Sequence, residues 1–223
     1  MREFFMTSCP IGIWAITVLE FVLICLFFKR YKTDKRPIVL CMTFITIGLF
    51  IDALFISLGT LLPIGLLTTI SPIRYIAHGV LIPLLFPIAA YGLKAKDGFR
   101  KVVWVIAIIL MVAGAAEAIA TKLEPAEFAG VIRLVQGEGT PGWAVGISMA
   151  LSFGTVIPLM IAGIIIWAKQ KKPQLFLSGF FMFAFSALGP ATGNSDLIFY
   201  ISMFGELLMV TFFYLFAKAT EEK

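Results

Sequence analysis

Residues 74–101 read RYIAHGVLIPLLFPIAAYGLKAKDGFRK, an apolar run that ends in a cluster of basic residues. An α-helix rises about 1.5 Å per residue and the hydrocarbon core of a bilayer is roughly 30 Å thick, so about 20 apolar residues cross it. Lysines and arginines that directly follow such a run are retained on the cytoplasmic side. We therefore expect a helix at 74–93 that crosses a membrane from the outside to the cytoplasm.

The composition of the whole chain agrees with this class. Hydrophobic residues make up 60% of the 223 residues and charged residues only 14%, a balance that soluble globular domains do not show. The apolar runs lack barrel-like alternation, so each is expected to satisfy its backbone groups within its own helix. We predict an all-α integral membrane protein in which residues 1–223 form one polytopic domain, a seven-transmembrane helix bundle. The predicted helices lie at about 10–28, 37–59, 74–93, 102–121, 143–168, 175–191 and 197–217.

The basic residues predict the orientation of this bundle. Fourteen of the 18 Lys and Arg residues lie in the segments 29–36, 94–101, 169–172 and 218–223, which seven crossings place on one side. The positive-inside rule makes that side cytoplasmic, so we expect the N-terminus outside and the C-terminus in the cytoplasm of a cell-membrane protein. The charges are divided among short loops without an interleaved aromatic platform, so no nucleic-acid partner is expected.

One long loop, between 121 and 143, lies on the predicted outer side. Phe128, Val131, Ile132 and Val135 follow the spacing i, i+3, i+4 and i+7, which is typical of a short amphipathic helix in the membrane interface. A β-hairpin that covers the outer face also fits this segment. Either structure would cap the bundle or act as a gating lid.

Ionisable side chains inside the predicted spans are the candidate functional residues. Each costs at least about 2 to 3 kcal/mol at the middle of a bilayer and is expected to face the bundle interior. The candidates for binding a ligand or a proton are Glu20, Asp52, Arg74, His78, Glu117 and Glu206.

The predicted topology gives these candidates a depth and a set of neighbours. Arg74 and His78 start the third span and are expected close to the outer surface, above Glu20 and Glu206 near the middle. The first, second, third and last helices are expected to meet, so that Arg74 pairs with Asp52 or Glu206 while His78 titrates near neutral pH. Alternatively, Arg74 snorkels to the lipid phosphates and His78 only donates a hydrogen bond between helices.

The third span resembles the third helix of microbial rhodopsins. The match consists of RY at 74–75, at the outer start of the helix, followed by PLL at 83–85. The resemblance implies a seven-helix fold with an outward-opening central pocket. The family places a counter-ion acid and an aromatic residue where this chain has Ala77 and His78, and the last helix has no lysine before Lys218. Covalent retinal is therefore not expected, and light sensing and pumping are not implied.

These features leave three functional classes. The first is a small-molecule or cation transporter, with or without proton coupling, or a receptor-like sensor with an outward-facing polar pocket. The second is an intramembrane enzyme that acts on a lipid or isoprenoid through His78 and a carboxylate, and the third is a non-catalytic membrane subunit. One histidine and no cysteine cluster give no metal-ligand pattern. The sequence points to the bilayer and a small-molecule or ion ligand as partners, and it identifies no cofactor, catalytic residue or oligomeric state.

Overall fold

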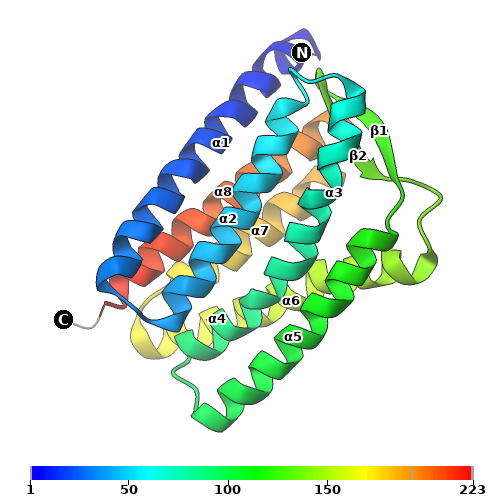
Figure 1. Cartoon of the computed structure of the whole chain (residues 1–223). Helices are drawn as coiled ribbons and strands as arrows, with labels where there is room; N and C mark the ends of the chain where they lie inside the picture. The colour runs from blue at the N-terminus through cyan, green and yellow to red at the C-terminus, as the bar shows by residue number, and fades with distance from the viewer. Residues whose placement is uncertain (1, 192, 222–223) are drawn as a thin grey trace.

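The computed structural model describes residues 2–191 and 193–221 and shows a bundle of long helices with a small sheet at one end (Figure 1). Helix α1 begins at the end where the sheet lies, and α8 finishes at the opposite end. The elements are α1 (Arg2–Thr33), α2 (Pro37–Leu58), α3 (Ile64–Leu81), the 3-10 helix η1 (Ile82–Leu84), α4 (Leu85–Gly92), α5 (Asp97–Ala120), β1 (Leu123–Phe128), β2 (Val131–Gln136), α6 (Gly142–Gln170), α7 (Gln174–Ala191) and α8 (Ser195–Ala219).

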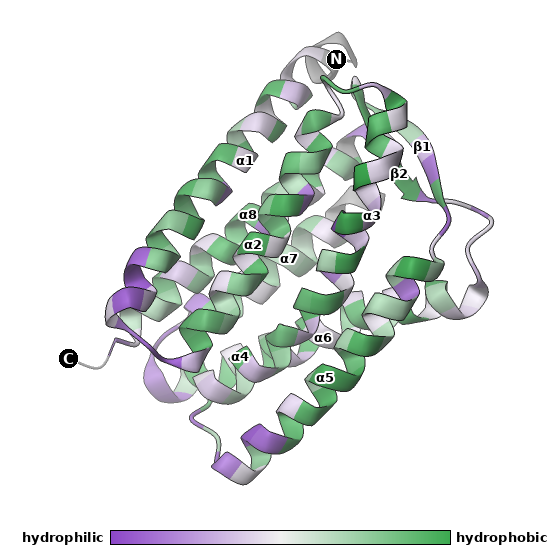
Figure 2. Cartoon of the chain, in the orientation of Figure 1, coloured by the Kyte–Doolittle hydropathy of each residue, from purple (hydrophilic) through white to green (hydrophobic). Residues whose placement is uncertain are grey.

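The helices have the length and composition of membrane spans. Six segments are long and apolar enough to cross a membrane, and Gln174–Ala187 is a shorter apolar helix. Hydrophobic residues cover the lengths of the helices, and hydrophilic residues gather at their ends (Figure 2). This is the architecture of a membrane-embedded helical bundle, as the sequence predicts.

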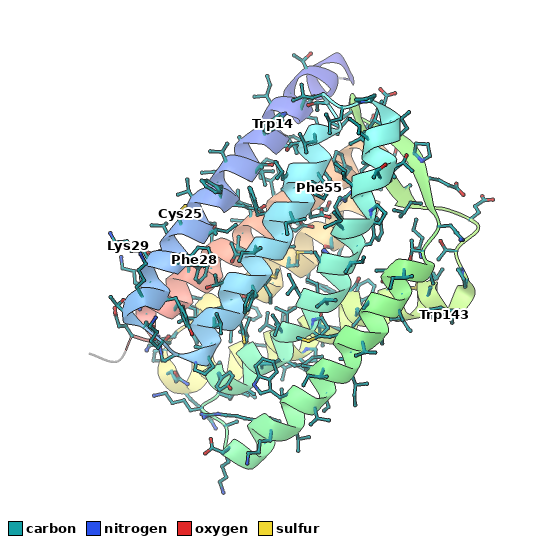
Figure 3. All side chains as sticks on the ribbon, viewed as in Figure 1. Trp14, Cys25, Phe28, Lys29, Phe55 and Trp143 are labelled. Carbon is teal, nitrogen blue, oxygen red and sulfur yellow. The ribbon has the colours of Figure 1, made fainter. Side chains whose placement is uncertain are left out.

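Exposed tryptophans mark the two ends of α6. Trp143 and Trp167 are both exposed and stand 24 residues apart, about 36 Å along the helix axis. Figure 3 shows Trp143 beside the sheet and Lys29 at the opposite end. Tryptophan is enriched at both interfaces of a bilayer. We call the end of the bundle that carries residues 29–36, 94–101, 169–172 and 218 the basic end, and the other the hairpin end.

The third span begins ten residues earlier than the predicted start at 74. Helix α3 begins at Ile64, after Pro63, and the continuous apolar span runs over Ile64–Gly92. Pro63, Gly65 and Pro72 interrupt this part of the sequence, but the helix continues through Pro72. The hydroxyls of Thr68 and Thr69 donate hydrogen bonds to carbonyls of the preceding turn at 2.9 and 3.0 Å. A hydroxyl satisfied in this way can remain in a helix within lipid.

The third span is interrupted at Pro83. Proline has no N–H and cannot continue the helical hydrogen-bond ladder. The chain forms the 3-10 helix η1 (Ile82–Leu84) there and resumes as α4.

The long loop between α5 and α6 is a β-hairpin. The hairpin alternative is therefore confirmed, the interfacial helix is wrong, and the bundle is not purely α-helical. Strands β1 and β2 pair antiparallel from Leu123 opposite Gln136 to Phe128 opposite Val131. The two turn residues, 129 and 130, have φ angles of 47° and 79°. Positive φ at both positions is the geometry of a two-residue hairpin turn. The apolar spacing of this segment alone could not distinguish that turn from a helix.

Helices α6 and α7 pack tightly at the basic end and separate toward the hairpin end (Figure 1). A Cβ atom on Gly163 would lie 2.5 Å from the backbone of Phe176, whereas Cβ atoms on Gly146 and Gly154 would meet nothing within 4 Å. Gly146, Ala150 and Gly154 follow a four-residue spacing that often lets a neighbouring helix approach closely, but no backbone approaches Gly146 or Gly154.

Candidate functional site

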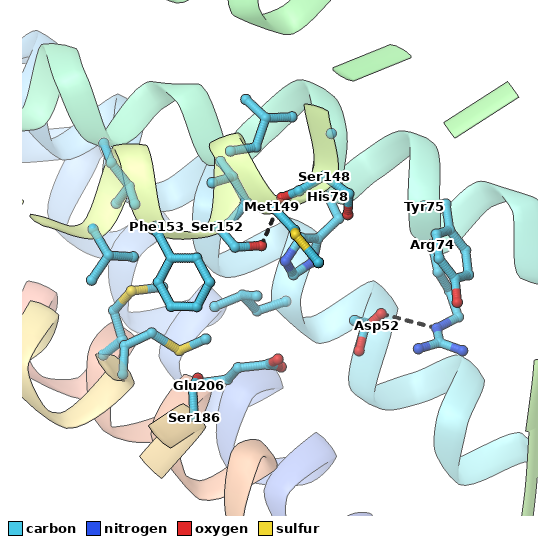
Figure 4. A pocket seen from close by; sticks show the side chains of 18 of the residues that line it. Asp52, Arg74, Tyr75, His78, Ser148, Met149, Ser152, Phe153, Ser186 and Glu206 are labelled. Carbon is cyan, nitrogen blue, oxygen red and sulfur yellow. Dashed lines mark hydrogen bonds and ion pairs between the residues drawn. The ribbon is translucent and has the colours of Figure 1, made fainter. Parts of the chain in front are cut away.

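A cavity of about 440 Å³ lies inside the bundle, between α2, α3, α5, α6, α7 and α8, and β2 contributes to its wall. Its size is that of a small-molecule pocket. Figure 4 shows the polar side chains that converge on it. The charged and polar residues in its lining are Asp52, Arg74, Tyr75, His78, Glu117, Arg133, Ser148, Ser152, Ser186 and Glu206.

Asp52 and Arg74 form a buried ion pair in this cavity. The Nε atom of Arg74 donates to Oδ1 of Asp52 at 2.9 Å, and the two side chains are only 4% and 11% exposed. The predicted pairing of these residues is confirmed, and the snorkelling alternative is wrong. Because α3 begins at Ile64, Arg74 lies ten residues into the span, about 15 Å from its start, and not close to the surface.

Glu206 brings an unsatisfied carboxylate from α8 into the cavity. The side chain is buried, and its Oε2 atom has no hydrogen-bond partner in the described part of the chain. Asp52, Arg133 and Arg74 are near enough to interact with it electrostatically. A buried polar oxygen without a partner costs free energy that a bound cation, proton or donor would remove.

His78 lies one helical turn beyond Arg74 and is half-buried. Its imidazole projects into the space between Asp52 and the Ser148–Ser152 segment of α6 (Figure 4). Within residues 2–191 and 193–221, the ring forms no hydrogen bond, so the alternative role as an interhelical donor finds no support there. The ring is therefore available to a ligand or to a proton.

Arg133 is a site residue that sequence reasoning missed. It projects from β2, and its guanidinium carbon lies 4.8 Å from the ring centre of Phe199 and 5.8 Å from that of Phe128. Burial, and then the positive charge of Arg74, lower the pKa of Arg133 below its usual range. The sequence contains one indication of this role, since Arg133 is the only charge in the apolar stretch VIRLV. An isolated cation in an apolar strand needs a buried partner or an aromatic surface.

The remaining two predicted residues differ in their placement. Glu117 lines the cavity and accepts a hydrogen bond from the Thr121 hydroxyl at 3.0 Å. Glu20 is fully buried in α1 but is not part of the cavity lining, and neither of its carboxylate oxygens has a described hydrogen-bond partner. It remains close enough to Glu206 and Asp52 for an electrostatic interaction. The expected convergence thus holds for Asp52, Arg74, His78 and Glu206 but not for Glu20, and Glu117 joins the cavity although the sequence predicted no contact for it.

The cavity reaches the outer surface of the bundle where α6 and α7 separate. Ser152 and Ser186 both line the cavity and are exposed. Phe153 and Phe183 stand between the same two helices as an edge-to-face pair, with ring centres 6.5 Å apart, and are 56% and 36% exposed. Two aromatic rings and two hydroxyls thus stand between the cavity and the exposed surface of α6 and α7.

In the described part of the chain, no three His, Cys, Asp or Glu side chains are grouped in a way that could hold a metal ion. A comparison of the chain with protein-family models and with curated proteins finds no match. The functional argument therefore rests on the chemistry of the cavity.

Proposed function

We propose that the protein is a seven-span cell-membrane protein, with its N-terminus outside and its C-terminus in the cytoplasm, whose cavity binds a small organic cation for transport or for sensing. The basic residues at the end opposite the hairpin support the orientation. The observation that carries the ligand class is the unsatisfied Glu206 carboxylate in a cavity where the other acids already have partners.

The charges around the cavity favour a cation over an anion, because three carboxylates line it against two guanidinium groups, those of Arg74 and Arg133. Asp52 is paired with Arg74, and Glu117 accepts a hydrogen bond from Thr121, so neither needs a ligand for compensation. Glu206 retains a free oxygen that no described donor approaches. Ionisable groups within membrane spans mark ion and substrate pathways because their burial is otherwise costly.

A proton can compete with the cation for this carboxylate. Competition between a proton and a cation for one carboxylate couples the transport of the two in a proton-coupled transporter. His78 also lines the cavity and is a second proton acceptor. The binding of a cation should therefore weaken as the pH is lowered.

Binding of tetramethylammonium, tetraethylammonium and a short alkylamine to the full chain in nanodiscs tests the proposal. We expect at least one probe to bind, and Glu206→Gln to weaken its binding at least about 30-fold, or about 2 kcal/mol, as for other buried charge contacts. Glu20→Gln is the matched control, because it removes a buried acid that does not line the cavity. Equal losses in both variants, or no binding to the wild type, would refute the proposal.

The separation of α6 and α7 favours a second candidate, an enzyme that acts on a lipid entering from the bilayer. His78 would then act as the acid or base, since general acid–base catalysis needs a titratable group beside the substrate. Turnover of a membrane lipid extract that disappears in His78→Ala would favour the enzyme over the cation-binding protein. Unchanged lipid in both proteins would exclude it.

A further inference from the structure

A second cavity, of about 520 Å³, lies at the basic end between the first turn of α2, the end of α4, the beginning of α5 and the end of α8. Its lining contains four basic residues and one acid. These are Arg36, Lys94, Arg100, Lys101 and Asp97. The cavity is separate from the polar cavity described above, and no lining residue is common to the two.

The Arg100 guanidinium lies against the ring of Tyr91, and its buried Nε donor has no described partner. Its carbon atom lies 5.2 Å from the ring centre of Tyr91, and Nη1 donates to Asp97 at 3.1 Å. The Tyr91 hydroxyl is itself fixed by the Trp104 indole N–H at 3.1 Å. The Nε atom of Arg100 is buried and has no hydrogen-bond partner in the described residues. An anion in the cavity would supply that partner.

Arg36 is also held in place before any ligand arrives. Its Nε and Nη2 atoms donate to the two carboxylate oxygens of Asp34 at 2.8 and 2.6 Å, and Nη1 donates to the Thr220 carbonyl at 2.6 Å. This bidentate pair fixes one wall of the cavity. Asp34 is the partner of Arg36, and the other basic residues in the lining are Lys94, Lys101 and Arg100, against the one acid Asp97.

Lys94 occupies a backbone conformation that favours glycine. Its φ angle is 53°, in the left-handed region, directly after the C-terminal turn of α4. A non-glycine residue is strained in this conformation because its Cβ atom crowds the following carbonyl oxygen. Lys171 adopts the same conformation after α6, with φ 58°, but does not line the cavity. The two lysines thus form a matched pair of which only one contributes charge to the cavity.

We infer that this cavity binds the phosphate of an anionic phospholipid whose acyl chains lie along the exposed apolar face of α5. Ile108 and Val112 are 53% and 67% exposed and continue, at four-residue spacing, the face of α5 on which Trp104 lines the cavity, which gives the chains an apolar surface. Basic pockets between helices at the cytoplasmic side of a bilayer bind anionic head groups. The inference does not depend on the function proposed for the polar cavity.

Native mass spectrometry of the full chain with dioctanoyl phosphatidylglycerol, dioctanoyl phosphatidylcholine or inorganic phosphate tests it. We expect the wild type to retain phosphatidylglycerol in preference to phosphatidylcholine. Lys94→Gly and Lys101→Gln should each weaken retention about fivefold, which corresponds to about 1 kcal/mol per basic residue. Lys94→Gly also removes backbone strain, so its unfolding temperature should not fall, and lost lipid cannot then be attributed to lost structure.

Two control variants isolate the cavity from the general positive charge of the basic end. Lys171→Gly changes the same backbone conformation, and Lys32→Gln removes an exposed lysine of the basic end, both outside the cavity. Both controls should retain phosphatidylglycerol like the wild type. Equal losses in controls and cavity variants, or equal retention of the two lipids, would overturn the site. Displacement of phosphatidylglycerol by millimolar inorganic phosphate would assign it to free phosphate and overturn the lipid.

Discussion

The ion pair between Asp52 and Arg74 predicts a strong energetic coupling between α2 and α3. The perturbation is a double-mutant cycle with Asp52→Asn, Arg74→Gln and the combined variant. Each single change leaves one charge without its partner in a site where the side chains are only 11% and 4% exposed. Removing one member of a buried pair destabilises a protein because the other charge stays buried.

The structure sets the size of this coupling. At the Nε–Oδ1 distance of 2.9 Å and an effective dielectric constant of about 20, the attraction between the charges is about 6 kcal/mol. Lost hydration offsets part of it, so each single variant should lose about 3 to 5 kcal/mol of the free energy of unfolding. The double variant contains no unpaired charge and should lose no more than either single one, which gives a coupling of at least about 3 kcal/mol.

The assay is reversible unfolding of the purified protein in mixed micelles with increasing dodecyl sulfate, followed by tryptophan fluorescence. Losses that add within about 0.5 kcal/mol would show that the two residues do not interact, and the ion pair would be refuted. A double variant as stable as the wild type would agree with the reasoning, since hydrophobic or neutral replacements of buried pairs are often tolerated.

Two further predictions concern the packing of α3 on α5 and the basic end. Gly79→Val should lower the unfolding temperature, because its Cβ atom would lie 2.5 Å from the backbone oxygen of Gly114, and such overpacking costs at least about 1 to 3 kcal/mol. Gly154→Val is the control, since it adds a side chain in open space. Equal unfolding temperatures for the two variants would contradict the contact. The hydrogen bond from Arg36 holds the pKa of Asp34 below its usual range. The stability that this carboxylate contributes is therefore fully present above the pKa it has in the unfolded chain, and it is lost as the pH falls through the lower pKa it has in the folded protein. Asp34→Asn should therefore lower the free energy of unfolding by about 1.5 to 3 kcal/mol at pH 7. In an acid titration of the free energy of unfolding, the difference between this variant and the wild type should shrink below about pH 4. A difference that does not change with pH would contradict a stabilising Asp34 carboxylate.

The helices and the class of the protein could be predicted from sequence because each apolar run is a local property. The predicted ends of most spans agree with the structure to within a few residues, as for 37–59 against Pro37–Leu58. The predicted start of the third span, residue 74, was wrong because α3 begins at Ile64 and continues through Pro72, a residue that usually ends or kinks a helix. As a result, Arg74 was predicted close to the outer surface of the membrane, whereas it lies ten residues into the span.

The composition of the candidate site could be predicted only in part because it depends on contacts between distant segments. Arg133 enters the cavity only after the hairpin folds over the bundle, where Tyr75 donates from its hydroxyl to the Leu134 carbonyl at 3.2 Å. Glu20 has the depth of a site residue but not the position, since α1 is not among the helices that line the cavity. The resemblance of 74–85 to a rhodopsin helix stays a prediction.

The two cavities favour ligands of opposite charge, so the two proposals can be tested independently. In the polar cavity three carboxylates face two arginines, and among the described residues Oε2 of Glu206 and Nε of Arg133 have no hydrogen-bond partner. In the basic-end cavity four basic residues face one acid, and Nε of Arg100 has no such partner. A cation that binds the first should not bind the second, and an anionic head group should show the reverse preference. Glu206→Gln should therefore retain phosphatidylglycerol, and Lys101→Gln should retain the organic cation. Loss of both ligands in either variant would indicate unfolding of the bundle, whereas one loss in each variant requires two independent sites.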